Sequence, residues 1–270
     1  MLSGIDFRRK LGKNISIYPF NEQNIESANI CVTASEFAWS IGEEKEYLFT
    51  KESGMGKYNK GRIRIPAKQS ALVFTQEALY LGEKLAGSCL ARVDLSLKGL
   101  GYNGGPLKSE RAELLKIPMY NQTEHDVYID VGERIAVLMI HELSSKDKSK
   151  QSEDDDHNTK IDEFLSKCKS SENVIRLLNM SRGLNSKDDI TKKMENDPNY
   201  KKYNNSENTL FKRIMRNKTM FVCTLLLVVL LLIICLFIKD RQPYLTVFAA
   251  LIGGDLGMIG GLLLKKFKLE

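Results

Sequence analysis

Cysteine and histidine are scarce in this chain of 270 residues, which has five cysteines and three histidines. The cysteines show no C-x-x-C spacing, and the histidines do not cluster with them. Their positions are Cys31, Cys89, Cys168, Cys223 and Cys235, and His125, His141 and His157. Disulfide frameworks and zinc sites need such residues at characteristic spacings. We therefore expect neither a disulfide scaffold nor a metal site made of protein side chains.

A signal sequence is also lacking, because the first residues (MLSGIDFRRKLGKN) contain no apolar core region. Charge of one sign does not dominate either. The formal net charge is +6, and much of the excess of lysine and arginine flanks two apolar segments near the C-terminus. We expect no nucleic-acid partner.

The two apolar segments are residues 220–238, which carry no charge, and residues 244–264. At about 1.5 Å per residue, the first is long enough to cross the roughly 30 Å hydrocarbon core of a bilayer. Basic residues precede the first segment and follow the second, which is typical of cytoplasmic flanks. The sequence thus predicts two transmembrane helices over residues 219–265, in contact with membrane lipid. The N-terminal domain and the C-terminus are then cytoplasmic.

The second apolar segment has small residues at a four-residue spacing, at Ala249, Gly253, Gly257 and Gly261. Such spacing lets helices approach closely, so we expect this face to pack against the first segment or another chain. Asp255 lies near the middle, where an ionised carboxylate is costly unless it is paired, hydrated or protonated. Three alternatives remain: a protonated, hydrogen-bonded Asp255, a ring of carboxylates lining a water-filled path in an oligomer, or a re-entrant second segment.

Residues 1–144 contain many short strand-like segments separated by turn residues such as glycine and asparagine. This pattern favours a sandwich or barrel over βαβ units, so we expect a mainly β domain. The expected strands include residues 15–18, 27–34, 37–40, 70–75, 79–81, 87–93, 113–119 and 134–141.

Residues 145–218 are expected to form a charged linker and helical connector. The stretch 144–160 (SSKDKSKQSEDDDHNTK) has no apolar residue and cannot form a core. Residues 161–182 fit a helix with one apolar stripe, which we expect to pack on the β domain or on a neighbouring copy. Residues 187–208 are polar, with a turn signal at Asn196, Asp197 and Pro198.

Four motifs between residues 65 and 143 follow one another in a distinctive order. Residues 65–77 (IPAKQSALVFTQE) end in a T-x-E element, and residues 87–95 (GSCLARVDL) contain S-x-L-A-R. Residues 120–123 (YNQT) suggest a turn, and residues 129–140 (IDVGERIAVLMI) a hairpin that turns at Gly132. Together these motifs resemble those of the deoxycytidine triphosphate deaminases, within the dUTPase and dCTP deaminase superfamily.

This resemblance implies a distorted dUTPase-like β-barrel that assembles as a homotrimer, with nucleotide sites between subunits. In the family, the serine and arginine of the S-x-L-A-R element hold phosphate oxygens, for which hydroxyl, N–H and guanidinium donors are suited. The corresponding nucleotide-binding residues here are Ser88, Cys89 and Arg92. The only cofactor implied is Mg²⁺ accompanying a nucleotide.

The chain departs from the family pattern where the chemistry takes place. The family glutamate that moves protons lies three residues before the turn asparagine, and that position here is Pro118. Glu110 and Glu113 are the nearest carboxylates and remain the catalytic candidates. Cys31 replaces an aspartate of an early family motif, and Asp94 replaces a glycine.

Two functions of different class follow. The first is a membrane-anchored, catalytically degenerate domain that binds or senses a nucleotide and organises an oligomeric membrane hairpin, as in a defence effector. The second is an active deaminase or pyrophosphatase (dCTP to dUTP, or dUTP to dUMP) tethered to the membrane. A structural trimer without a ligand is a third reading. The missing glutamate favours the first.

Overall fold

The computed structural model describes residues 2, 4–26, 29–51, 61–102, 104–145 and 160–207. Met1–Ser206 forms one compact unit. Within the described residues, no helix combines the length and apolar character needed to cross a membrane. The predicted hairpin at residues 219–265 lies outside the described residues, as do Ala249, Gly253, Asp255, Gly257 and Gly261.

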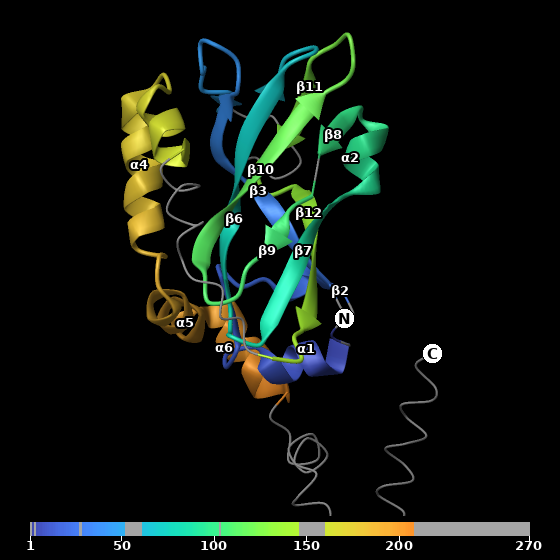
Figure 1. Ribbon diagram of the computed structural model, residues 1–270, viewed down its shortest axis with the longest axis vertical. Helices are drawn as coiled ribbons and strands as arrows, with labels where there is room; N and C mark the ends of the chain where they lie inside the picture. Colours follow the sequence, from blue (N-terminus) through green and yellow to red (C-terminus); the bar gives the residue numbers. More distant parts are fainter. Residues whose placement is uncertain are drawn as a thin grey trace, which may run out of the picture. The chain divides into compact units, whose positions relative to one another are not determined.

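A large antiparallel sheet forms the body of the domain (Figure 1). Within the described residues its strand order is β8-β10-β6-β3-β12-β7-β9, with β1 paired to β6 and β2 to β3. A smaller sheet has the order β11-β5-β4. The bounds are β1 Ile15–Tyr18, β2 Ile25–Glu26, β3 Asn29–Ser40, β4 Phe49–Thr50, β5 Arg62–Ile65, β6 Ser70–Leu81, β7 Leu85–Ala91, β8 Leu100–Tyr102, β9 Pro106–Leu107, β10 Ala112–Asn121, β11 Val127–Asp130 and β12 Arg134–Glu142. The prediction of a mainly β domain is confirmed.

Strands β3 and β6 are each longer than the sequence predicts. Each was expected as two short strands, but each continues through its polar interruption. The pairing of β3 with β6 shifts register between Ala34 and Ala38, so the interruption is an irregularity within a strand. The Ser35 hydroxyl donates to the Phe74 carbonyl at 2.7 Å and accepts from the Phe37 amide at 3.1 Å. These bonds satisfy backbone groups that the irregular pairing leaves free.

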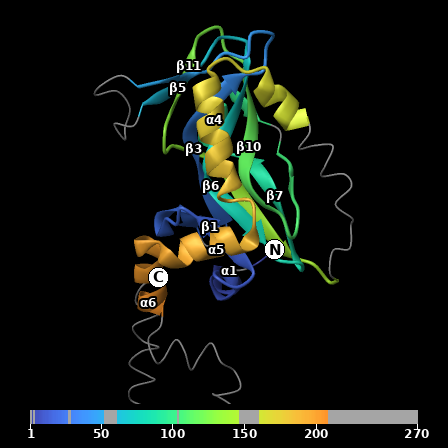
Figure 2. The same ribbon diagram turned by 90° about the vertical axis from the view of Figure 1, so that its left-hand side faces the viewer.

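Helix α4 (Ser171–Arg182) covers the outer face of β3, β6 and β10 (Figure 2). Val174 and Leu177 of α4 are buried in one cluster with Trp39 and Phe74 of the sheet. The Trp39 indole donates to the Lys169 carbonyl at 3.0 Å. Of the two expected arrangements, the structure therefore has this helix packed on its own β domain. Residues 160–166 form a separate, shorter helix before α4.

Three further helices lie near one end of the sheet, namely α1 (Gly4–Lys10), α5 (Lys187–Asn196) and α6 (Pro198–Glu207). The polar stretch after residue 187 is thus helical, and the expected turn separates α5 from α6. Helix α5 contacts β1: the Ile17 amide donates to the Met194 sulfur at 3.3 Å. The sequence did not predict α5 and α6 as helices, because this stretch is polar and few of its side chains are buried, such as Ile190 and Met194 of α5.

Residues 87–93 were expected to be one strand, but β7 ends at Ala91 and the short helix α2 (Val93–Leu97) follows. Arg92 lies at this change of direction, with extended backbone. The expected turn at Gly132 is confirmed, because its φ is 91° and the Glu133 amide donates to the Asp130 carbonyl across the turn at 2.9 Å. A positive φ of this size favours glycine.

Candidate functional site

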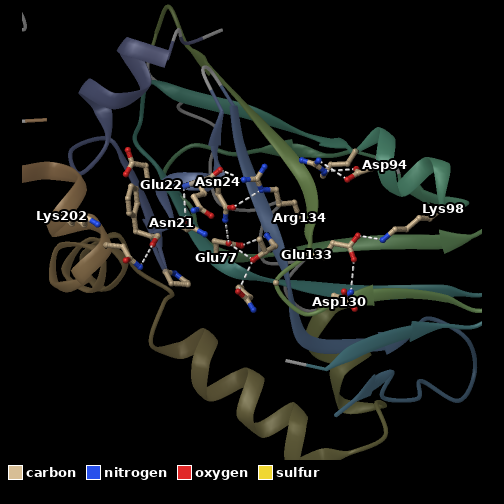
Figure 3. A pocket seen from close by; sticks show the side chains of 18 residues that line it. Asn21, Glu22, Asn24, Glu77, Asp94, Lys98, Asp130, Glu133, Arg134 and Lys202 are labelled. Atoms are coloured by element: carbon tan, nitrogen blue, oxygen red, sulfur yellow. Dashed lines mark hydrogen bonds and ion pairs between the residues drawn. The ribbon is translucent and has the colours of Figure 1, made fainter. Parts of the chain in front are cut away.

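A polar cavity of about 1000 Å³ opens beside strands β3, β6 and β12. Its wall includes the segment between β1 and β2, the start of α2, the turn between β11 and β12, and helix α6 (Figure 3). The lining residues are 19–24, Thr33, Gln76, Glu77, Arg92, Asp94, Lys98, Asp130, 132–134, Asn199 and Lys202.

Glu77 is a buried carboxylate in the cavity wall, with 3% of its surface exposed. Its oxygens accept hydrogen bonds from the Thr33 amide at 2.7 Å, the Thr33 hydroxyl at 2.8 Å and the Asn24 amide group at 3.2 Å. Burial raises the pKa of Glu77 to about 7, against the opposing effect of these hydrogen bonds. A carboxyl with this pKa can gain or lose a proton near neutral pH.

Arg134, at the start of β12, ties the segment between β1 and β2 to the sheet. Its Nε donates to Asn24 Oδ1 at 3.3 Å. Its other nitrogens donate to the Glu26 carboxylate and to the Gln23 carbonyl. Asn24 therefore connects Arg134 to Glu77, and Figure 3 shows these three side chains together. The network fixes one wall of the cavity.

Arg92 also faces the cavity, where its guanidinium meets Asp94. Nε donates to Oδ1 of Asp94 at 2.9 Å, and Nη2 donates to Oδ2 at 3.1 Å. These bonds lower the pKa of the Asp94 carboxyl from its ordinary value. The remaining terminal nitrogen, Nη1, lies 3.3 Å from the Cys31 sulfur. Burial raises the pKa of the Cys31 thiol, which favours its neutral form.

Acidic residues balance the cations along this cavity. Four lysine and arginine side chains line it, against five aspartate and glutamate side chains. Lys98 pairs with Glu133, and Asp130 pairs with Arg62 at 2.9 Å. The lining therefore carries no excess of positive charge, unlike a site whose cations are free to meet a polyanion.

Of the residues predicted to bind nucleotide, only Arg92 is in the cavity lining. Cys89 is 4% exposed and packs in the main core, while Ser88 lies on β7 opposite Met139 and Pro106. The catalytic candidates also lie elsewhere. Glu113 forms ion pairs with Arg111 and Lys116, both at 2.9 Å. Glu110 lies in the turn before β10, where its amide donates to the Leu81 carbonyl.

The sequence reasoning missed Glu77, Asn24 and Arg134 as site residues. Glu77 offered one signal, since it is the one charged residue of β6 and closes the T-x-E element. The contributions of Asn199 and Lys202 had no sequence signal, because they depend on where α6 docks. Among the described residues, no group of three or more His, Cys, Asp or Glu side chains is arranged to hold a metal ion.

Comparisons with known proteins agree with this description of the domain. Residues 58–166 match the dUTPase family model. The dCTP deaminase of Thermococcus sibiricus is 24% identical over 149 residues, which cover 52% of this chain and 83% of the relative. The dCTP deaminase of Pyrococcus abyssi is 25% identical over 149 residues, covering 52% of this chain and 84% of the relative.

Solved structures give weaker matches. A dCTP deaminase from Agrobacterium tumefaciens has a TM-score of 0.40 and 11% identity, covering 52% of this chain and 46% of its own length. The dUTPase of EIAV has a TM-score of 0.35 and 14% identity, covering 50% of this chain and 94% of its own. The family model and the two archaeal relatives support a place in the dUTPase and dCTP deaminase superfamily. The chain thus carries a dUTPase/dCTP deaminase-like domain.

Proposed function

We propose that this protein is a membrane-anchored, catalytically degenerate member of the superfamily, which binds a nucleotide in the polar cavity. The observation that carries the proposal is the position of Arg92. This arginine of the family phosphate motif faces a cavity of about 1000 Å³, which falls at the upper end of the range typical of small-molecule sites. A guanidinium there suits a phosphate group.

Degenerate catalysis is supported by what lies at the family's acid position. Pro118 occupies it, on the exposed side of β10, and proline can neither accept nor donate a side-chain proton. Glu113 lies on the same strand but is engaged with two cations. Neither residue lines the cavity.

The second candidate function, a nucleotide deaminase or pyrophosphatase, is favoured by one observation. Glu77 is a buried carboxyl within the cavity wall, with a pKa of about 7. Such a group has the proton affinity required of a general base or acid at neutral pH. Under this alternative, Glu77 takes the role that the family glutamate has in the relatives.

A nucleotide would bring Mg²⁺ with it under either function. Three of the five cavity carboxylates, Asp94, Asp130 and Glu133, are already engaged with Arg92, Arg62 and Lys98. The ion would therefore be coordinated mainly by phosphate oxygens and water, which suits the preference of Mg²⁺ for keeping several waters.

Homo-oligomerisation is supported by an exposed apolar patch beside Arg92. Leu90, Val93 and Leu97 are 40%, 75% and 84% exposed. Apolar side chains gathered around a binding residue are typical of an interface, and the family resemblance implies a trimer. A trimer would bring three predicted hairpins together and place three copies of Asp255 near one another.

Helix α6 is the described element that precedes the predicted hairpin in the sequence. Asn199 and Lys202 of α6 line the cavity, and α6 ends at Glu207, before the apolar segment that starts at residue 220. A ligand that prefers one position of α6 would shift the equilibrium between arrangements of the hairpin.

The decisive experiment uses the full chain in detergent, with dCTP, dUTP and Mg²⁺. Nucleotide binding is measured by calorimetry, and product formation by chromatography. We expect saturable binding without product. Formation of dUTP or dUMP in proportion to protein concentration, abolished in Glu77→Gln but not in Glu113→Gln, would establish the enzyme instead. Absence of binding by every nucleotide would leave the structural trimer.

The role of the hairpin has a separate test, which is membrane depolarisation on expression of the full chain. If the Asp255 carboxylates line a water-filled path, Asp255→Ala should change the depolarisation, because charged side chains set ion selectivity at close quarters. Asp240→Ala, in the short loop between the segments, is the matched control. Depolarisation equal to that of the unmodified chain in Asp255→Ala would exclude a pore lined by this residue.

A further inference from the structure

Asp94 already fills the anion-binding fork of Arg92. Its two oxygens accept from Nε and Nη2 of the guanidinium at 2.9 and 3.1 Å. Parallel N–H···O bonds of this kind are also how a guanidinium holds two oxygens of a phosphate. A phosphate that approaches Arg92 therefore meets donors that are engaged by the chain's own carboxylate.

The two partners of this ion pair differ in how firmly they are held. The Arg92 side chain is 21% exposed and has a further contact at Cys31, whereas the Asp94 side chain is 52% exposed. Asp94 also has an alternative donor, since its Oδ1 accepts from the Leu95 amide at 3.1 Å. On displacement, Asp94 can turn toward solvent while Arg92 stays in place.

Two of the other three cations of the cavity are also engaged. Lys98 is paired with Glu133, and Arg134 is engaged with Glu26, Asn24 and the Gln23 carbonyl. Release of Arg92 requires that a partly exposed ion pair be broken. Solvent screens such a pair but its geometry is bidentate, so occupation of the fork should reduce the affinity for a phosphate by about fivefold to tenfold.

We propose that Asp94 is an internal competitor for the phosphate of the ligand at Arg92, and that it sets the ligand concentration at which the cavity fills. The inference rests on the proposed nucleotide-binding function. Competition acts only on ligands that carry an anionic group. Asp94 therefore determines specificity between phosphorylated and unphosphorylated forms of one nucleoside, by weakening the binding of the phosphorylated form alone.

The test measures equilibrium binding to the full chain in detergent with three probes: inorganic tripolyphosphate, dCTP and deoxycytidine. Asp94→Asn keeps the shape of the side chain and removes its charge. We expect dissociation constants for tripolyphosphate and dCTP to fall by about fivefold to tenfold, and that for deoxycytidine to stay unchanged. Asp126→Asn is the matched control, because Asp126 pairs with Arg64 at 2.6 Å away from the cavity lining. The double variant Arg92→Gln/Asp94→Asn should not show this increase in affinity for tripolyphosphate and dCTP.

The outcomes separate this inference from the proposed function. Equal or weaker binding of both anions by Asp94→Asn overturns the inference, and so does an equal gain in Asp126→Asn. If the variant binds dCTP as the original chain does, nucleotide binding stands and the competition does not. If Asp94→Asn binds tripolyphosphate more tightly while neither dCTP nor deoxycytidine binds, the competition stands and the nucleotide function fails. Thermal unfolding of each variant confirms that it is folded.

Discussion

At the scale of single residues, Glu77 is the most unusual group in the domain. It is the one charged residue of β6, and only 3% of its surface is exposed. Three donors from Thr33 and Asn24 surround it, so the buried oxygens are not left unpaired. Burial nevertheless outweighs these bonds and raises its pKa. The site therefore holds a group that changes charge near neutral pH.

Glu77 should make the stability of the protein depend on pH. The pKa of its carboxyl is raised from 4.5 to about 7 in the folded state, so the folded protein binds this proton more tightly than the unfolded chain. The stabilisation is fully present below about pH 4.5 and is lost as the pH rises through about 7. A shift of this size corresponds to about 3 kcal/mol in the free energy of unfolding.

The measurement is urea unfolding of the full chain at pH 4.5 and pH 8. Glu77→Gln removes the titrating group, so the free energy of unfolding of the variant relative to the original chain should rise between the two pH values. Glu113→Gln is the control, because this carboxylate is 26% exposed and ion-paired. Identical pH dependence in the original chain and Glu77→Gln would contradict the assignment.

The residue scale also marks where sequence reasoning stops. Cys31 and Asp94 were each recognised as departures from the family pattern. The sequence could not reveal that both contact Arg92, because Cys31 lies 61 residues before Arg92. The strand order brings them together: β12 pairs with β3 through Val137 and Cys31, and with β7 through Val137 and Leu90. Contacts between side chains across three strands depend on the register of strand pairing, and sequence motifs alone do not specify that register.

At the scale of elements, α4 completes the β domain. It buries Val174 and Leu177 against a cluster that includes Trp39, which is fully buried. The apolar stripe in residues 161–182 predicted one helix, but the structure has two helical segments, residues 160–166 and α4. Val174 and Leu177 are buried as expected, whereas Ile175 is exposed. The left-handed backbone at Ser170, with φ of 69°, lies in the break between the two segments, and this break could not be inferred from the apolar spacing.

Two substitutions on α4 test this packing. Leu177 is 1% exposed, and Leu177→Ala should lower the free energy of unfolding by about 2 to 5 kcal/mol, because it leaves a cavity. Ile175 lies on the same helix but is 57% exposed, and Ile175→Ala should change the free energy by less than about 0.5 kcal/mol. Urea unfolding measures both. Equal effects of the two substitutions would mean that α4 does not pack on the sheet.

At the scale of the whole molecule, the cavity wall is in direct contact with the segment that contains α5 and α6. Asp197, between α5 and α6, accepts from the Phe20 amide at 3.1 Å and from the Asn199 amide at 2.8 Å. Phe20 packs on Tyr200 and Tyr203, with ring centroids 5.3 and 5.2 Å apart. The sequence predicted the turn at Asp197 but not the hydrogen bond from Phe20, because these residues are 177 positions apart and meet only in the folded domain.

This arrangement predicts reciprocal coupling between the cavity and α6. A nucleotide that orders residues 19–24 should slow amide hydrogen exchange in residues 198–207, since these segments are joined through Asp197. Asp197→Ala removes both hydrogen bonds to the carboxylate, so it should reduce the protection of α6. Loss of an N-terminal cap of this kind typically costs about 0.5 to 2 kcal/mol, so the domain should remain folded.

The matched control is Asp188→Ala, which makes the same chemical change on the exposed first turn of α5 and should leave the protection intact. Reciprocity demands a second result: if bound nucleotide stabilises α6, then Asp197→Ala must weaken nucleotide binding, by the same free energy that the coupling contributes. Protection of α6 that persists undiminished in Asp197→Ala would disprove coupling through this residue. Unchanged exchange on nucleotide binding in the original chain would disprove coupling through α6 altogether, and the predicted hairpin would then serve as an anchor that does not respond to the cavity.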